Sequence, residues 1–368
     1  MLQTDSIWIE NDYLCKIKLL KMKSYVFPGD IDPALMKIAG EPIPYMRTQE
    51  FSEINLESEI MLLNLIHCTG GRTIIYTGSG TGAMSAVVEN YVTTKRKAIV
   101  IDGGSFGHRW YSLCEYYGAD AIDYTVPFAK DIDYEDLEAR VKADKPDVLL
   151  CQHHETSTGQ LFNLKKISDI CHRHGVTLVV DVISSFLAED LSMDELGIDI
   201  CVTSTQKGLN ILPGLSVLFF SAALDGYPFA HKGYYWDFED NFSNLRRGQT
   251  PFSPATSLYL QLHARLKQLE AEGGEEHNIG LVRHRAGVFR ALCKEYGWDV
   301  PAEVPSVAVT GFQTKDKDRK VFRGLIEKYE TYIMPGSVPG FYRVSHMGLQ
   351  TDEELRELAE RIHELEQE

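Results

Sequence analysis

The chain has 368 residues, enough for one large and one smaller domain, and its 44% hydrophobic and 24% charged content is that of an ordinary globular protein. Its 37 basic and 53 acidic residues give a net charge of −16. This balance argues against non-specific binding to nucleic acid or to an anionic membrane, because both need basic patches. It does not exclude a small anionic ligand, since a local pocket can still be cationic.

The start of the chain and the cysteines bear on location. The first thirty residues include the basic run 17–23 and no uninterrupted apolar stretch, so we expect neither a signal peptide nor a membrane span there. The seven cysteines are odd in number, widely spaced and without a C-x-x-C pair. We therefore expect buried free thiols and a cytoplasmic location, where thiols stay reduced.

Short β-branched runs alternate with amphipathic stretches from about residue 72 to 221. We predict strands at 72–76, 97–102, 121–124, 147–151, 176–181, 198–204 and 215–221, and helices at 82–91, 108–117, 134–143, 164–174 and 193–196. This alternation predicts an α/β fold with a mostly parallel sheet covered by helices on both faces. The last strand follows a Pro-Gly turn with no helix before it, so it can pair antiparallel with its predecessor.

The alternation of predicted strands and helices stops between residues 222 and 254, a stretch rich in aromatic residues and glycine. We expect this segment to be functional, since long irregular stretches in compact domains usually are. A long helix is then predicted at 254–274. A smaller α/β domain follows it, with elements predicted at 281–296 (helix), 305–312 (strand), 318–329 (helix), 342–345 (strand) and 352–367 (helix). We predict an N-terminal segment at 1–40, a large domain at 41–272 and a small domain at 273–368.

Lys207 is the first candidate for a catalytic residue. It lies just past the predicted strand 198–204, and the predicted strand before that one ends in Asp181. A carboxylate at the tip of one buried strand and a lysine just past the next suit a pyridoxal phosphate (PLP) site. The amine can form a Schiff base with the cofactor, and the carboxylate can hold the pyridine nitrogen protonated.

A glycine-rich turn, residues 77–82 (TGSGTG), joins a predicted strand to a predicted helix. Its glycines allow close approach of a phosphate, Ser79 and Thr81 offer hydroxyls, and the helix N-terminus offers free N–H groups and a favourable dipole. The turn therefore predicts a phosphate-binding site.

The same turn also fits a dinucleotide fingerprint. Gly78, Gly80 and Ala83 have the required spacing, and Asp102 ends the next strand, where a ribose ligand would lie. An NAD(P)-binding oxidoreductase is therefore an alternative, although it leaves the lysine and the carboxylate described above without a role.

Three further features have candidate roles. Phe106 follows a predicted strand and can lie over a planar ring. The stretch 153–159 (HHETSTG) has three hydroxyls that can bond a ring hydroxyl, and its neighbouring residues point to opposite faces, so we expect no metal site there. Arg343 in the small domain can bind a carboxylate through two parallel hydrogen bonds.

These motifs, taken in order, resemble the class V aminotransferases of fold type I. The resemblance covers roughly residues 25–365, with alanine–glyoxylate (serine–pyruvate) and 2-aminoethylphosphonate–pyruvate aminotransferases as the best matches. The motifs that carry it are 27–29 (FPG), 78–82 (GSGTG), 155–159 (ETSTG), 180–185 (VDVISS), 205–208 (TQKG) with 213–214 (PG), 249–254 (QTPFSP) and 342–343 (YR). The resemblance implies PLP as cofactor and a homodimer with shared active sites.

The resemblance also implies a role for each matching residue. It makes Lys207 the Schiff-base lysine, Asp181 the partner of the pyridine nitrogen and Arg343 the ligand of the substrate carboxylate. The implied cofactor-binding residues are Ser79, Gly80, Thr81 and Gln206 at the phosphate, Phe106 over the ring, Ser157 near the ring hydroxyl and Thr250 at the phosphate of the partner subunit.

The implied activity is a ping-pong transamination that moves an amino group from a small amino donor to a 2-oxo acid of pyruvate or glyoxylate type. Alanine, serine, aspartate and aminoethylphosphonate all fit as donors. Asp30 stands where many members have the second proline of Pro-Gly-Pro, near the substrate mouth. The spacing around Thr250 also differs from that of the best-known members.

A class V lyase of the cysteine desulfurase type is a second alternative. Such enzymes need a mobile reactive cysteine in the C-terminal part, and the cysteine there is Cys293. It lies in a predicted amphipathic helix rather than in a loop, which argues against this activity.

Overall fold

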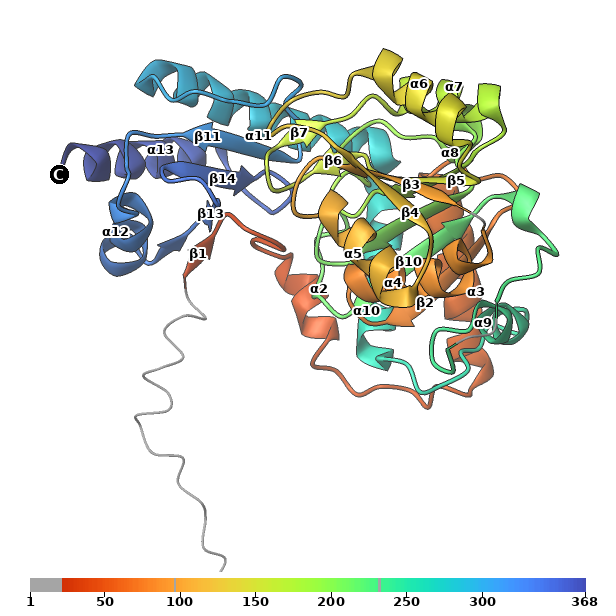
Figure 1. Ribbon diagram of the computed structural model, residues 1–368. Helices are drawn as coiled ribbons and strands as arrows, with labels where there is room; N and C mark the ends of the chain where they lie inside the picture. The colour runs from red at the N-terminus through yellow and green to blue at the C-terminus, as the bar shows by residue number, and fades with distance from the viewer. Residues whose placement is uncertain (1–21, 96, 231–232) are drawn as a thin grey trace, which may run out of the picture.

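The computed structural model describes residues 22–95, 97–230 and 233–368. Figure 1 shows a larger α/β body and a smaller one beside it, with helix α11 (Gly274–Tyr296) extending from the first into the second. None of the helices in the described part of the chain is long and apolar enough to cross a membrane.

A seven-stranded sheet forms the centre of the larger body, in the order β2-β10-β9-β8-β5-β3-β4. Its strands are β2 (Arg72–Thr77), β3 (Ala98–Asp102), β4 (Ala121–Thr125), β5 (Val148–Gln152), β8 (Thr177–Asp181), β9 (Ile200–Ser204) and β10 (Leu215–Phe220). Strand β10 pairs antiparallel with both neighbours and the other pairs are parallel. The predicted α/β fold, the mostly parallel sheet and the antiparallel last strand are confirmed.

Both faces of the sheet are buried, which is why its strands read as nearly continuous hydrophobic runs rather than alternating ones. On one face, α4 and α5 cover an apolar cluster that includes Val87, Trp110 and Phe220. On the other face, helices α3, α7 and α10 pack over a second cluster that includes Ile167 and Leu262. The helices of this body are α2 (Pro33–Ile38), α3 (Gln49–Leu65), α4 (Gly80–Asn90), α5 (Gly107–Tyr117), α6 (Tyr134–Asp144), α7 (Leu164–His174), α8 (Met193–Leu196), α9 (Phe238–Leu245) and α10 (Thr256–Glu272).

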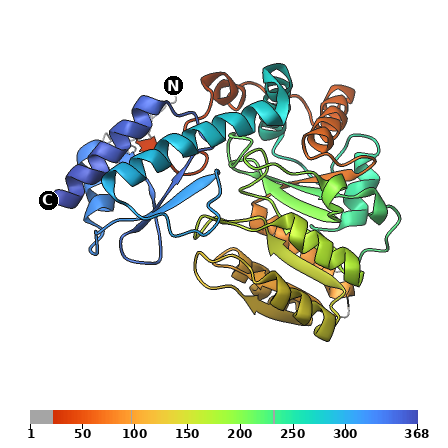
Figure 2. The ribbon, with the colours of Figure 1, turned by 90° about the horizontal axis from the view of Figure 1, so that it is seen from above.

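The smaller body has its own core. Its elements are α11, β11 (Val309–Gln313), α12 (Lys320–Tyr329), β12 (Thr331–Tyr332), β13 (Met334–Pro335), β14 (Phe341–Ser345) and α13 (Asp352–Gln367). Figure 2 shows α11 and α13 side by side, and they pack over the three-stranded sheet β11-β14-β13. Thr351 and Glu354 form a reciprocal capping box that fixes where α13 begins.

The N-terminal segment packs on the smaller body. Strand β1 (Lys23–Ser24) pairs in parallel with β12, and the next residue, Tyr25, is buried in the core under α13. Two short strands, β6 (His154–Glu155) and β7 (Gln160–Leu161), form a hairpin beyond β5. The domain boundaries at residues 40 and 272 stay predictions.

The structure corrects the element predictions at several places. Helix α11 begins at Gly274 rather than at residue 281, and β11 spans 309–313 rather than 305–312. The segment 222–254 includes a regular helix, α9, whose N-cap is Asp237 and which is followed by the left-handed Gly248. Aromatic side chains of α9 pack against β10, and this tertiary packing stabilises a helix that the periodicity of the sequence does not indicate.

Buried neutral histidines predict a stability that falls in acid. Burial lowers the pKa of His346 to about 3, and also lowers the pKa of His153 to about 4. Because these folded pKa values lie below the unfolded value near 6.5, the unfolded chain binds more protons in acid. The stabilisation is complete above about pH 6.5 and is lost as the pH falls toward the folded values.

We expect His346→Gln to flatten the pH dependence of the free energy of unfolding. Its side chain can still bond Thr310, whose hydroxyl lies 2.8 Å from His346 Nε2. Between pH 7 and pH 5 the wild type should lose about 2 kcal/mol more than this variant, because one titrating group is removed. Urea unfolding at the two pH values measures this, and equal losses would contradict the assignment.

Candidate active site

The topology brings Asp181 and Lys207 to one edge of the sheet. Asp181 is the last residue of β8, and Lys207 comes three residues after β9 ends at Ser204. The two strands are parallel neighbours, with Asp181 paired to Val202. Carboxyl ends of parallel strands meet at the same edge, which is where open α/β sheets bind ligands.

Asp181 is a buried carboxylate with few ways to be solvated. Its side chain is 5% exposed, and Oδ1 accepts a hydrogen bond from the Ile183 N–H at 2.7 Å. Burial raises the pKa of Asp181, and the Glu155 carboxylate raises it further, while the Ile183 N–H and the cations Lys207 and Arg109 oppose the rise. A buried carboxylate of this kind needs a positive partner, and a protonated ring nitrogen is one.

Lys207 carries an amine that is poorly protonated for a lysine. Burial lowers the pKa of Lys207 to about 7; Asp181 opposes this shift, and the guanidinium groups of Arg343 and Arg109 add to it. Its Nζ lies 3.2 Å from the centre of the Phe27 ring. A neutral amine is the nucleophilic form, so this environment activates the lysine for Schiff-base chemistry.

The loop after β2 has the features of a phosphate site. Ser79 caps α4, its Oγ accepting from the Gly82 N–H at 3.3 Å, and Gly80 and Thr81 begin the helix. A Cβ on Gly80 would collide with Ile183, and Ser204 Oγ lies 3.4 Å from that Cβ position. Ser204 Oγ is buried without a hydrogen-bond partner, as a hydroxyl reserved for a ligand would be.

Arg109 supplies the positive charge of this region. It lies one turn after Phe106 on α5, its Nη1 donates to Thr81 Oγ1 at 2.9 Å, and its guanidinium stacks over the Phe106 ring at 4.8 Å. Free helix N–H groups, a hydroxyl without a partner and a guanidinium together fit a phosphate monoester. The residues present therefore fit PLP.

Glu155 ties two loops of the site together. Its carboxylate accepts the backbone N–H groups of Phe106 and Gly107 at 3.2 and 3.0 Å, and also accepts the Ser157 N–H at 3.0 Å. The Ser157 hydroxyl also bonds Glu155, and it accepts the Ser105 N–H at 3.1 Å. Phe106 and Ser157, which come from loops far apart in sequence, are thereby held beside each other at the site.

Arg343 reaches the site from β14. Its Nη1 donates to the Thr156 carbonyl at 2.9 Å and its Nη2 to the Pro335 carbonyl at 3.0 Å. Its Nε is buried and has no hydrogen-bond partner. Two carbonyls thus fix the orientation of the guanidinium, and its remaining N–H groups are available to donate to an anion.

The structure brings Lys207 and Asp181 to one edge of the sheet, and the roles of the predicted site residues stay predictions. Gln206 is half-buried directly before Lys207. Thr250 is not joined to this group within the chain: its hydroxyl donates to the Phe252 carbonyl at 2.7 Å, and its own carbonyl accepts from Arg47 at 2.6 Å.

Sequence reasoning missed Phe27, Arg109 and Ser204. Arg109 could have been found from its spacing, since three residues after Phe106 is one helical turn. Ser204 could have been found as the end of the strand before Lys207. No local signal identifies Phe27 as a neighbour of Lys207, because the contact joins residues 180 positions apart.

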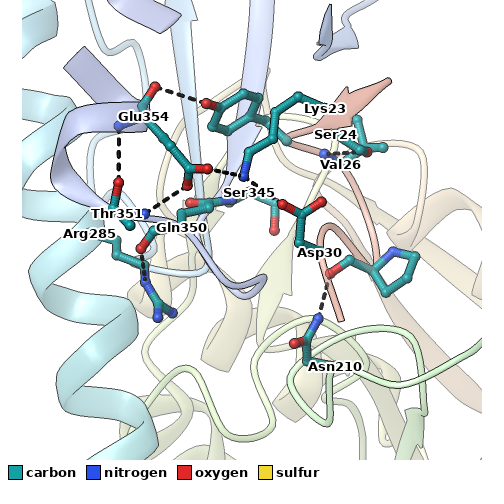
Figure 3. Close-up of polar contacts among 12 residues, drawn as sticks. Lys23, Ser24, Val26, Asp30, Asn210, Arg285, Ser345, Gln350, Thr351 and Glu354 are labelled. Atoms are coloured by element: carbon teal, nitrogen blue, oxygen red, sulfur yellow. Dashed lines mark hydrogen bonds and ion pairs between the residues drawn. The ribbon is translucent and has the colours of Figure 1, made fainter. Parts of the chain in front are cut away.

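The unusual Asp30 has a structural task. Figure 3 shows Lys23 bonded to both Asp30 and Glu354, so that Asp30 faces the smaller body. Each of these two contacts is 2.5 Å long. The backbone before it is held as well, since Asn210 Nδ2 donates to the Pro28 carbonyl at 2.7 Å. Asp30 therefore fixes the N-terminal segment, and Phe27 is the residue of that segment that contacts Lys207.

The dinucleotide alternative is wrong, because its two strands are not neighbours. Strand β2, which leads into the glycine-rich turn, is separated from β3 by β10, β9, β8 and β5. Asp102, the expected ribose ligand, instead accepts the Gly104 N–H and lies 2.8 Å from His108 Nδ1. Asp102, His108 and Asp123 could together reach a metal ion, but the last two are exposed, and we assign no metal role.

The desulfurase alternative gains no support from the structure. Cys293 is fully buried on α11, and burial raises the pKa of its thiol to about 12. A reactive cysteine needs the opposite environment, accessible and with a lowered pKa.

Comparisons with known proteins agree with this geometry. The sequence model of the family described as Aminotransferase class-V matches residues 44–243. Serine–glyoxylate aminotransferase of Hyphomicrobium methylovorum is 30% identical to this chain, over 76% of this chain and 71% of its own length. L-aspartate–glyoxylate aminotransferase of Paracoccus denitrificans is 27% identical, over 88% of this chain and 86% of its own length. The crystal structure of alanine–glyoxylate aminotransferase from Nostoc sp. has a TM-score of 0.87 at 20% identity, covering 99% of this chain and 97% of that one. The predicted resemblance and fold type are confirmed.

The environment of Lys207 predicts how its reactivity depends on pH. With a pKa near 7, the amine is mostly neutral from about pH 7 upward, whereas an ordinary lysine gains neutral amine up to about pH 10.5. The rate at which cofactor-free protein condenses with PLP, divided by the rate for Nα-acetyl-lysine, should fall about tenfold per pH unit above pH 7.5. A constant ratio up to pH 9 would contradict the lowered pKa.

Proposed function

This chain belongs to the class V aminotransferase family, and from that premise we propose that it moves an amino group from a small amino donor to a 2-oxo acid of pyruvate or glyoxylate type. It is a PLP-dependent enzyme, as the members of this family are. The glyoxylate-using relatives support this choice of acceptor.

The observation that carries the proposal is the pairing of Lys207 with Asp181. A half-buried lysine with a lowered pKa and a buried carboxylate with a raised pKa lie close enough to act on each other electrostatically. Perturbed pairs of this kind are concentrated at catalytic sites. The lysine suits carbonyl chemistry, and the carboxylate suits a protonated nitrogen.

We assign the residues that would hold the cofactor from the family resemblance, with the geometry of the site as support. Ser79, Gly80, Thr81 and Gln206 would bind the phosphate, as predicted, with Arg109 and Ser204 added. Phe106 would cover the ring, and Ser157 would lie near the ring hydroxyl. Asp181 would keep the ring nitrogen protonated, so that the bound cofactor draws electrons from the carbon that loses a proton.

Lys207 would act as base and then as acid. When it is not bound to the cofactor, the Lys207 amine would be free to take the proton from the donor's Cα. A pKa near 7 suits both directions, because the amine is then ready to accept a proton and to return it. Arg343 would hold the substrate carboxylate so that the Cα proton stays within reach of Nζ. With a 2-oxo acid in place of the donor, Lys207 and Arg343 would serve the same roles in the reverse direction.

We also propose a homodimer with shared active sites. Thr77, Tyr235, Thr250 and Phe252 line a narrow cavity on the side of the glycine-rich turn. Tyr234 is 87% exposed beside it, and Tyr235 stacks on Phe252 with ring centres 5.2 Å apart. Exposed aromatic side chains of this kind suit a subunit interface, from which Thr250 would reach the partner's phosphate. A cytoplasmic location is consistent with the six described cysteines, which are all free.

A spectrum of the purified holoenzyme tests the proposal. We expect a visible absorption band that bleaches with an amino donor and returns with pyruvate or glyoxylate. Lys207→Ala should lose turnover and covalent cofactor attachment, because it lacks the amine. Lys130→Ala, which removes an exposed lysine paired with Glu303, is the matched control and should behave as wild type. A protein that PLP cannot reconstitute, or a fully active Lys207→Ala variant, would refute the proposal.

Arg109→Met tests the added phosphate ligand without measuring turnover. We expect the affinity of the cofactor-free protein for PLP to fall by about 10- to 100-fold, as for the loss of a charged hydrogen bond, while pyridoxal, which lacks the phosphate, loses little. Equilibrium dialysis measures both. Arg140→Met, which removes a half-exposed arginine on α6, is the control. Equal losses for PLP and pyridoxal would remove Arg109 from the phosphate site.

A further inference from the structure

The ring of Phe27 lies against the amine that does the chemistry. Lys207 Nζ is 3.2 Å from the ring centre, which is direct contact. In the reaction proposed above, the donor's Cα must come close enough to Lys207 for its proton to be taken. Every group attached to Cα then lies within a few ångströms of this ring.

Phe27 is held in place by both bodies of the molecule. On the larger body, Asn210, three residues after Lys207, bonds the Pro28 carbonyl. On the smaller body, the Leu349 N–H donates to the Asp30 carbonyl at 3.1 Å, and Gly29 packs against Gly348 so closely that a Cβ would lie 3.2 Å from the Gly348 Cα. Because the segment that carries Phe27 is held on both sides, moving the ring aside for a larger substrate would cost free energy.

The Lys23 bridge completes this anchoring. Figure 3 shows its amine between the carboxylates of Asp30 and Glu354, and the Tyr25 hydroxyl donates to the Glu354 carbonyl at 2.8 Å. Lys23 and Asp30 lie on either side of Phe27 in the chain. The segment that carries the ring is thus fastened to the start of α13 on both sides of it.

The surroundings of the ring are apolar. Phe27 packs against a buried cluster that includes Ala188, Ala308 and Met347, together with the half-buried Met334. Met334 is paired with Arg343 across β13 and β14. The described residues that surround Phe27 next to the proposed carboxylate ligand are therefore hydrophobic.

The cations near Lys207 already have partners. In the described part of the chain, the charges that act on Lys207 are Asp181, Arg343 and Arg109. Arg343 serves the α-carboxylate in the proposed reaction, and Arg109 is bound to Thr81 on the phosphate side. Within this chain, a carboxylate on the donor's side chain would meet the Phe27 ring without a cation to pair with, which is costly.

We propose that Phe27 selects the amino donor, admitting α-amino acids with a small uncharged side chain and rejecting donors with a bulky or anionic one. The inference rests on the proposed transamination and adds the substrate class to it. Glycine, alanine and serine are of the accepted class, whereas leucine and aspartate are of the rejected one.

A donor series tests the selection on the holoenzyme. The second-order rate constant for bleaching is measured with alanine, serine, leucine and aspartate, for the wild type and for Phe27→Ala. We expect the wild type to prefer alanine to leucine and to aspartate by at least about 100-fold, and Phe27→Ala to reduce the alanine-to-leucine ratio by at least about 10-fold. A merely structural role would lower all four rates together and leave the ratios unchanged.

Two further variants keep the test decisive. Phe27→Leu retains an apolar wall, should fold if Phe27→Ala does not, and should give intermediate ratios. Phe128→Ala removes a phenyl ring that is 43% exposed and contacts Phe341, and it should leave the ratios unchanged. Calorimetric titration of the holoenzyme with propionate, 4-methylpentanoate and succinate gives the same ranking without turnover. Propionate should bind best to the wild type, and Phe27→Leu should tolerate 4-methylpentanoate better.

The outcomes separate this inference from the proposed function. A wild type that takes leucine or aspartate as well as alanine, or ratios that Phe27 variants do not change, overturns the role of Phe27 while transamination stands. A wild type that no donor bleaches overturns the proposed function itself.

Discussion

The site depends on the parallel pairing of β8 with β9. That register places a buried carboxylate at the end of one strand and a half-buried lysine just past the end of the next. Burial alone would neutralise both groups, and their mutual attraction opposes this, so each is left able to change its charge during a reaction. A cofactor with a protonated ring nitrogen and an aldehyde would offer a partner to each group, the nitrogen to the carboxylate and the aldehyde to the amine.

The rest of the structure supports this pair in two ways. Glu155 uses one buried carboxylate to hold the loops of Phe106 and Ser157 together, so that the faces of the site are fixed before any ligand arrives. The smaller body contributes Arg343 and, through the N-terminal segment, Phe27. Neither lies near Lys207 in the sequence, and both reach it because the two bodies pack against each other.

Much of this arrangement could be predicted from the sequence. The β-branched runs predicted all seven strands of the central sheet, because strands buried on both faces are hydrophobic throughout. The position of Asp181 and Lys207 at one edge of the sheet follows from the rule that parallel strands end at a common edge. The antiparallel β10 followed from the short Pro-Gly turn before it. The glycine-rich turn fitted two kinds of site, and the order of the strands in space decided between them.

Other features could not be predicted, for physical reasons. Helix α9 is stabilised by aromatic side chains that pack on β10, and no periodicity in the segment shows this. Asp30 stood out as a departure from its family, yet its carboxylate is used for an ion pair with Lys23. Phe27 reaches Lys207 only through packing between segments far apart in the chain. Long-range contacts of this kind depend on the whole fold, and a local pattern does not contain them.

The most direct measurement is the site of cofactor attachment. The holoenzyme is reduced with borohydride, digested and mapped by mass spectrometry. We expect a pyridoxyl group on the peptide that contains Lys207 and on no other lysine. A label on another lysine, or no label on a protein that transaminates, would contradict it.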